Sequence, residues 1–115
     1  MNRAAAVNKK DALFVLNNLL EMHPMRKDAY YGSLRTLGLI IIDDRRFFHL
    51  PIDADAELRT LPAADFERCA ALLCMLLRED HWFENAFDER LVEGWPQRIV
   101  KRMIALLEEQ KNTEQ

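Results

Sequence analysis

The chain has 115 residues, of which 50% are hydrophobic and 30% are charged, and its formal net charge is −3. A chain of this size has room for one hydrophobic core, so we expect a single globular domain over residues 1–115, with flexible ends at 1–7 and 110–115. The acidic balance disfavours a protein that works mainly by neutralising nucleic-acid phosphates.

The N-terminal third of the chain predicts two helices. Asn8 is a good N-cap, and the leucines that follow recur on one helical face until Pro24 removes a backbone donor, which predicts a first helix over about residues 9–23. A second helix continues to Gly38, because glycine readily takes the left-handed conformation that closes a helix.

The hydrophobic period changes after Gly38. Residues 39–42 form a mostly β-branched run, Asp43 begins a polar break, and residues 46–50 form a second extended segment before Pro51. We therefore predict one two-stranded β-hairpin over about residues 39–50. This hairpin must pack on the helices, because two strands alone are only marginally stable in water.

A third helix follows the irregular segment 51–61. Pro62 is suited to its first position, and residues 69–77 are apolar on every side, which is typical of a central buried helix. This run is about half as long as a membrane span requires, and residues 1–7 lack the apolar region of a signal peptide, so we expect a cytoplasmic protein without a membrane partner.

Two further helices complete the predicted fold. The fourth carries Phe83, Phe87 and Leu91 at intervals of four residues and ends at Gly94, and the fifth begins at Pro96. The predicted fold class is thus mainly α (α+β), with about five helices around a central apolar helix and one β-hairpin.

The side chains that catalysis needs are not arranged for it. Ser33 is the only serine and lacks a nucleophile turn, and Cys69 and Cys74 lie in the most apolar segment, where we expect unpaired, buried thiols. The spacing of a helical metal half-site also occurs, at His81, Glu84 and Asp88. No second histidine is close to it, and a solvated acidic face is the simpler interpretation. We expect no enzyme, no cofactor and no metal.

Aromatic bulk and unneutralised charge coincide at residues 79–95, which we call the acidic aromatic face. Residues 79–93 alone carry six carboxylates and one arginine, a local charge of −5. A partner would use an exposed aromatic anchor and its acidic surroundings, which predicts a partner-binding set of Trp82, Asp80, Glu84, Asp88 and Glu89. In the structural alternative, the aromatic side chains pack the fourth helix onto its neighbours: Trp82, Phe83, Phe87 and Trp95.

A second functional hypothesis concerns DNA. The second helix followed by a hairpin with arginines at its tip resembles the recognition helix and wing of winged-helix proteins, with Arg35, Arg45 and Arg46 as the nucleic-acid-binding residues. There is little room for the helix that normally precedes a recognition helix, and the acidic net charge disfavours phosphate binding.

Short motifs between residues 30 and 105 resemble a bacterial family known as domain of unknown function 6508. They are a strand that ends near an Asp, an Ala-Asp helix start, an Arg-x-Glu/Asp-Arg-Phe-Cys-Glu/Asp-Gly segment, a Glu-x-Gly turn and a helix that ends in Arg-Leu. In this chain they correspond to Ile42-Asp43, Ala64-Asp65, Arg78 to Asn85, Glu93-Gly94 and Arg102-Met103. The chain differs from the family pattern at His81, Trp82 and Asn85. The resemblance implies a shared fold and leaves the function open.

The favoured hypothesis is a small regulatory domain that binds a basic protein or nucleoprotein complex through the acidic aromatic face. One concrete form is an inhibitor carried by a phage or mobile element against host defence, of the anti-CRISPR kind. The alternative is a winged-helix-like transcriptional regulator that binds DNA. The sequence does not indicate the oligomeric state.

Overall fold

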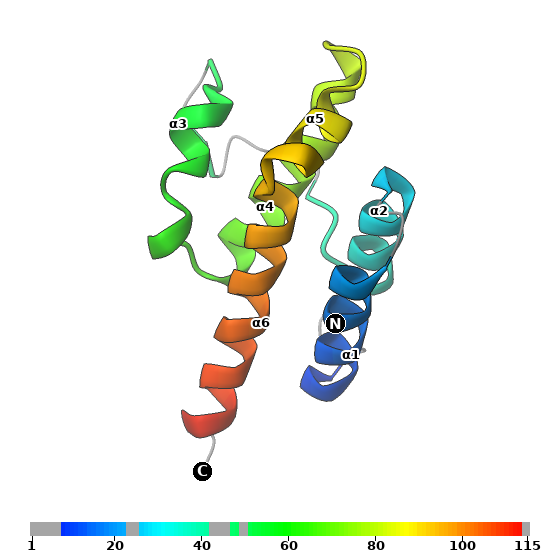
Figure 1. The fold of residues 1–115 in the computed structure, drawn as a ribbon. Helices are drawn as coiled ribbons and strands as arrows, with labels where there is room; N and C mark the ends of the chain where they lie inside the picture. The colour runs from blue at the N-terminus through cyan, green and yellow to red at the C-terminus, as the bar shows by residue number, and fades with distance from the viewer. Residues whose placement is uncertain (1–7, 23–25, 42–46, 49–50, 114–115) are drawn as a thin grey trace.

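The computed structural model describes residues 8–22, 26–41, 47–48 and 51–113. Within these ranges the chain forms six α-helices, two short 3₁₀ helices and no strand (Figure 1). In chain order they are α1 (Lys9–Glu21), α2 (Lys27–Thr36), α3 (Ala54–Leu58), η3 (Leu61–Ala63), α4 (Phe66–Arg78), η4 (Glu79–His81), α5 (Ala86–Glu93) and α6 (Trp95–Thr113). We predicted flexible ends at residues 1–7 and 110–115. Residues 1–7 and 114–115 lie outside the described residues, and residues 110–113 belong to α6, which continues to Thr113.

The two N-terminal helices are bounded by the predicted caps. The side chain of Asn8 accepts a hydrogen bond of 2.8 Å from the backbone N–H of Asp11, which satisfies a donor of the first turn of α1. At the end of α2, Gly38 has a φ of 71°, and the N–H of Leu39 donates to the carbonyl of Leu34 at 2.8 Å. This is the Schellman arrangement that a glycine at this position favours.

The predicted β-hairpin is wrong. Residues 39–41 have no regular secondary structure and residues 47–48 lie in a turn and a bend, while residues 42–46 and 49–50 lie outside the described residues. The segment packs on α4 instead of pairing with a strand. The N–H of Ile41 donates to the sulfur of Cys74 at 3.3 Å, and the guanidinium of Arg68 donates to the carbonyl of Phe47. Side chains of α4 thus occupy backbone groups that a neighbouring strand would otherwise use.

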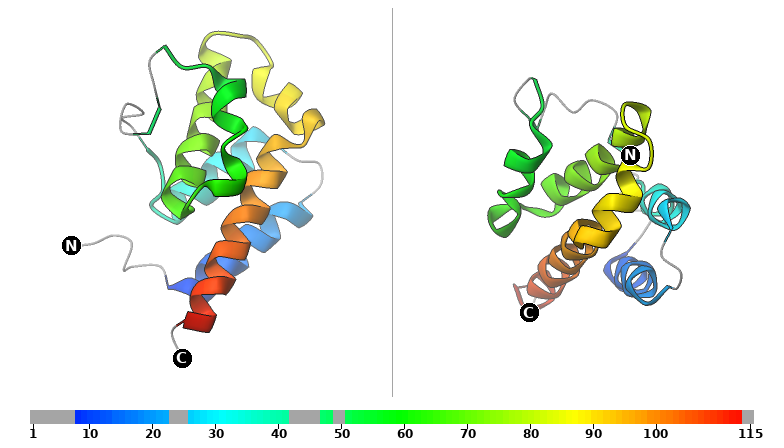
Figure 2. Two further views of the ribbon diagram at one scale, coloured as in Figure 1. Left: turned by 90° about the vertical axis from the view of Figure 1, so that its left-hand side faces the viewer. Right: turned by 45° about the horizontal axis from the view of Figure 1, so that its top comes forward.

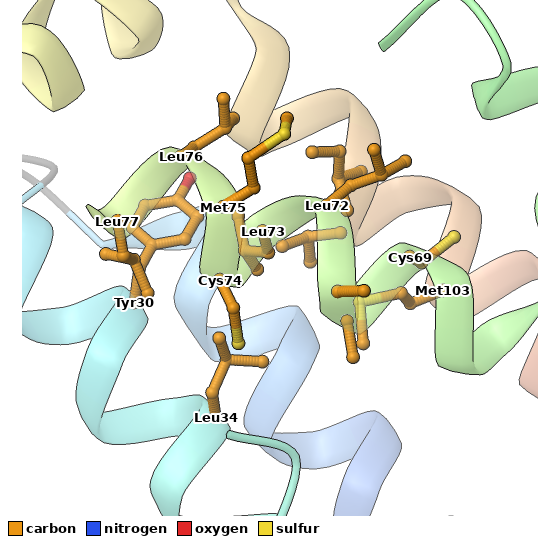
Figure 3. Close-up of a cluster of buried hydrophobic side chains, with 14 of the residues drawn as sticks. Tyr30, Leu34, Cys69, Leu72, Leu73, Cys74, Met75, Leu76, Leu77 and Met103 are labelled. Atoms are coloured by element: carbon orange, nitrogen blue, oxygen red, sulfur yellow. The ribbon is translucent and has the colours of Figure 1, made fainter. Parts of the chain in front are cut away.

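Helix α4 is the centre of the molecule, as its apolar composition predicts. Every residue from Cys69 to Leu77 is buried. Figure 3 shows these side chains gathered with Tyr30 and Leu34 of α2 and Met103 of α6. Neither cysteine forms a disulfide in the structure, and burial raises the pKa of the Cys69 thiol to about 11, so this thiol is neutral at physiological pH.

The start of α4 differs from the prediction. Pro62 lies in η3, and α4 begins only at Phe66, where the carboxylate of Asp65 accepts a 2.8 Å hydrogen bond from the N–H of Arg68. An N-cap that satisfies a free backbone donor defines the helix start better than a proline, which only tolerates that position.

The other helices surround α4 and the long helix α6, which packs on it. In Figure 1, α1 and α2 lie on one side of this pair and α3 lies on the other, and the second view in Figure 2 agrees. The connection from α4 to α5 lies at the end of the molecule opposite the C-terminal end of α6. Among the residues that the structure describes, no helix has both the length and the apolar character that a bilayer span needs.

Candidate functional site

The connection between α4 and α5, residues 79–85, is a tight corner made of η4 and a turn, and the predicted fourth helix does not begin within it. The N–H groups of Trp82 and Phe83 both donate to the carbonyl of Glu79 at 2.9 Å, and Asn85 then takes a left-handed φ of 63°. This conformation interrupts any continuous helix, so α5 begins at Ala86. The predicted fourth helix carried Phe83, Phe87 and Leu91. In the structure α5 contains Phe87 and Leu91, and Phe83 lies in the turn before it.

The four aromatic side chains of the acidic aromatic face divide into two pairs. Phe87 is fully buried against Tyr30, with 5.4 Å between ring centroids, and Trp95 is half-buried beneath the guanidinium of Arg98. By contrast, Trp82 is 78% exposed and Phe83 is 68% exposed. The structural alternative in which all four residues pack the fold is therefore wrong for the two corner residues.

The exposed aromatic side chains border a hollow between α3 and the end of α4, which we call the aromatic groove. It has a volume of about 610 Å³. It is lined by Ile52, Asp53, Ala54, Asp55, Met75, Arg78, Glu79, Trp82 and Phe83.

A second hollow, the acidic hollow, continues from the aromatic groove along α5 and has a volume of about 440 Å³. It is lined by Asp55, Glu79, Phe83, Glu84, Ala86, Glu89, Arg90 and Glu93. Three lining residues, Asp55, Glu79 and Phe83, are common to both hollows, so the two adjoin, and we call them together the depression. Six carboxylates and two guanidinium groups line this depression, a formal net charge of −4.

Arg90 organises the wall of the acidic hollow. Its guanidinium makes a two-pronged contact with Glu79, with both nitrogen–oxygen distances at 2.9 Å, and it also contacts Asp55 at 3.0 Å and Glu93 at 3.1 Å. The hydrogen bonds that Arg90 donates to Glu79 are the main cause that raises the pKa of its guanidinium well above its ordinary value, so Arg90 remains charged. One cation thereby holds three carboxylates from α3, η4 and α5 close together, and the cluster remains negative.

The predicted partner-binding carboxylates occupy two kinds of environment. Glu84, Asp88 and Glu89 are exposed and form no ion pair with any residue that the structure describes. Glu84 and Glu89 line the acidic hollow, whereas Asp88 lies on α5 outside both hollows.

Asp80 has a role inside the fold. Its carboxylate accepts a 2.9 Å hydrogen bond from the N–H of Phe87 and pairs with the ammonium of Lys27 at 2.7 Å. Burial alone would raise the pKa of the Asp80 carboxyl, but the contacts with Lys27 and Phe87 outweigh it and lower the pKa below its ordinary value. Asp80 therefore joins η4 to α2 and α5.

Sequence reasoning missed several residues that form the depression. Ile52 and Asp55 come from a segment far from the acidic run in sequence, and only the packing of α3 beside α4 brings them to it. Met75 lies on α4, one helical turn before Glu79, and the sequence did not show that it faces the groove. The pair Arg90 and Glu93, at an i,i+3 spacing, was the one signal available in the sequence.

The other sequence-based candidates are not brought together. Arg35 is exposed on α2, and Arg45 and Arg46 lie outside the described residues, as does most of the predicted wing. His81, Glu84 and Asp88 lie in η4, in the turn and in α5, and so do not share one helical stripe. Within the described part of the chain, no group of three or more potential ligands is placed to hold a metal ion.

No family model, curated protein or solved structure matches the chain. The resemblance to domain of unknown function 6508 thus stays a prediction from short motifs. The function is therefore inferred from the surface chemistry of the chain.

Proposed function

We propose that this protein is a non-enzymatic binding domain whose acidic aromatic face binds a basic protein. The observation that carries the proposal is the exposure of Trp82 and Phe83, at 78% and 68%, beside carboxylates that have no cationic partner in the described part of the chain. Large exposed aromatic side chains next to one another are unusual on a monomer, and they are the residue types that dominate binding energy at interfaces.

The two features have complementary roles in binding. Covering Trp82 and Phe83 removes apolar area from water, which supplies affinity. The carboxylates Glu84, Asp88 and Glu89 attract a cationic surface and orient it during approach. A basic protein, alone or within a nucleoprotein complex, meets both requirements.

The test uses the full-length chain as bait to isolate a partner, which is then purified and measured against single variants. We expect Trp82→Ala and Phe83→Ala each to raise the dissociation constant about tenfold or more, because each removes an aromatic anchor. Phe14→Ala is the matched control. Phe14 is as exposed as Phe83, at 68%, but lies on α1, which α4 and α6 separate from α3 (Figure 1).

Circular dichroism should show that all three variants fold as the parent chain does, because the three side chains make little contact with the core. If the partner binds both corner variants as tightly as it binds the Phe14 variant, the acidic aromatic face is not the binding surface. A purified partner that proves to be acidic, or to be DNA alone, also contradicts the proposal.

A further inference from the structure

We propose that the segment of the partner that occupies the aromatic groove carries an arginine beside a large apolar residue. In this arrangement the guanidinium stacks on the exposed ring of Trp82 and pairs with the carboxylates of the acidic hollow, while the apolar side chain enters the groove above Met75. This inference rests on the proposed function and specifies the chemistry of the partner.

The charge of the depression selects the class of occupant. A second copy of the chain that docked symmetrically, face to face, would place the same net charge of −4 opposite itself, and nucleic acid would bring phosphates to it. Both approaches are repulsive. A cationic segment of another protein is the occupant for which the electrostatic interaction is favourable.

The floor of the aromatic groove is apolar, so it favours an apolar side chain in the partner segment in addition to a cationic one. Ile52 is 37% exposed at its border, and Met75 is almost fully buried beneath it, so a side chain that enters meets aliphatic and thioether surface. A flexible methionine adapts its shape to different apolar side chains. A segment with cations alone would leave this surface wet and so lose part of the available affinity.

Arginine suits the walls of the depression better than lysine. Its planar guanidinium stacks on aromatic rings and bonds carboxylates with two parallel hydrogen bonds, whereas an ammonium is a compact and strongly hydrated point charge. The stacking of a guanidinium on an aromatic ring already occurs twice within the described part of the fold. The guanidinium of Arg98 lies 4.5 Å from the ring centre of Trp95, and that of Arg68 lies 5.2 Å from the ring centre of Phe48.

The carboxylates have separate tasks in this arrangement. Glu79, Asp55 and Glu93 are already held by Arg90, which fixes the negative wall in place before any partner arrives. Glu84 and Glu89 form no ion pair in the described part of the chain, and they line the same hollow as Phe83. They are the acceptors that an incoming guanidinium can engage without breaking an existing contact.

The experiment uses short amidated peptides that carry a fluorescent label and differ in one feature. The first alternates arginine with leucine, the second replaces arginine by lysine, and the third replaces leucine by serine. Fluorescence anisotropy gives the affinity of each peptide for the full-length chain. In the Trp95→Phe background, Trp82 is the remaining tryptophan, and its emission reports contact at the groove.

We expect the arginine–leucine peptide to bind saturably and to change the emission of Trp82. The lysine and serine peptides should each bind about threefold or more weaker. Trp82→Ala should weaken binding of the arginine–leucine peptide about tenfold, and the double change Glu84→Gln, Glu89→Gln about threefold to tenfold with a smaller salt dependence. Phe14→Ala should have no effect.

Equal affinity for the arginine and lysine peptides would overturn the assignment of arginine, and equal affinity for the leucine and serine peptides would overturn the apolar contact. Binding that is insensitive to Trp82→Ala would overturn the location. If no peptide binds while capture of the natural partner still depends on Trp82, this inference fails and the proposed function stands. If capture of the partner does not depend on Trp82, the proposed function itself fails.

Discussion

Asp80 shows how one carboxylate can hold together parts of the chain that are distant in sequence. It accepts a hydrogen bond from the N–H of Phe87 in the first turn of α5, where the positive end of the helix favours an anion, and it pairs with Lys27 at the start of α2. Both contacts favour the ionised form. They therefore make the stability of the fold depend on pH.

We predict that Asp80→Asn lowers the free energy of unfolding by about 1 kcal/mol at neutral pH, because the amide loses the ion pair and the charge at the helix start. The pKa of this carboxyl is lower in the folded chain than its ordinary value of 3.8, so the folded state binds this proton less readily than the unfolded state. The contribution is present in full above that value and is lost as the pH falls through the lowered pKa.

Urea unfolding of both chains across the acidic range measures this effect. The difference between parent and variant should shrink below pH 3.8. Glu109→Gln, an exposed change near the end of α6, is the control and should leave the profile unchanged. A difference between Asp80→Asn and the parent that stays constant through the acidic range would show that the ion pair contributes nothing to folding.

At the scale of the elements, Arg90 ties the short helix α3 to η4 and α5. Helix α3 has only five residues and little capacity to form alone, so its position depends on tertiary contacts. The arginine side chain is 15% exposed and that of Glu79 is 16% exposed, which makes the loss of either one costly for the other.

We predict that Arg90→Met lowers the free energy of unfolding by about 2 kcal/mol or more, because it leaves the shielded carboxylate of Glu79 without its cation. Arg90→Lys should recover only part of this loss, since an ammonium cannot reproduce the two-pronged contact. Urea unfolding monitored by tryptophan fluorescence measures both.

Arg59→Met is the matched control for this prediction, because Arg59 is exposed and forms no ion pair with a described residue. It should change stability by less than about 0.5 kcal/mol. Equal losses for Arg59→Met and Arg90→Met would mean that the carboxylate cluster does not stabilise the packing of α3.

The helices that could be predicted from the sequence are those whose position depends on residues close to one another in the chain. The caps at Asn8 and Gly38 and the apolar run of α4 act over a few residues, and they define these helices in the structure as expected. The predicted hairpin was wrong because β-branched residues also pack well on a helix, and tertiary contacts with α4, such as those of Ile41 with Cys74 and of Phe47 with Arg68, decide between the two.

The candidate site was predicted only in part, for the same reason. The charge and aromatic content of residues 79–95 are visible in the sequence, and the exposure of Trp82 is not. Trp82 lies in the turn before α5, and this turn ends at Asn85, whose left-handed conformation the sequence did not predict. The groove itself needs α3, whose placement beside α4 is a long-range contact.

At the scale of the whole molecule, charge is distributed unevenly. Residues 79–93 have a formal charge of −5, whereas the whole chain has a formal charge of −3, so the remaining residues together carry +2. In the fold this acidic segment lies at the end occupied by α5, opposite the C-terminal end of α6 (Figure 1). Such an asymmetry creates a field that orients a charged partner before contact and speeds its association.

We predict that the double change Glu84→Lys, Asp88→Lys lowers the association rate constant for the captured partner about tenfold at low salt, and less as salt is added, because salt screens exposed charges. The dissociation rate should change less than it does in Trp82→Ala, where a contact is lost. Surface plasmon resonance or stopped-flow fluorescence separates the two rate constants.

The control for this prediction has the same net charge change at the opposite end of the molecule. The double change Glu108→Lys, Glu109→Lys alters two exposed residues near the C-terminal end of α6. This variant has the same total charge as the Glu84→Lys, Asp88→Lys variant, but the electrostatic field around α5 is nearly that of the parent chain. We expect its association rate to remain within about twofold of the parent chain. If the two double variants slow association equally, total charge and not the acidic aromatic face controls the encounter. In that case the carboxylates around Trp82 and Phe83 contribute solubility, and the orientation of the partner depends on another part of the surface.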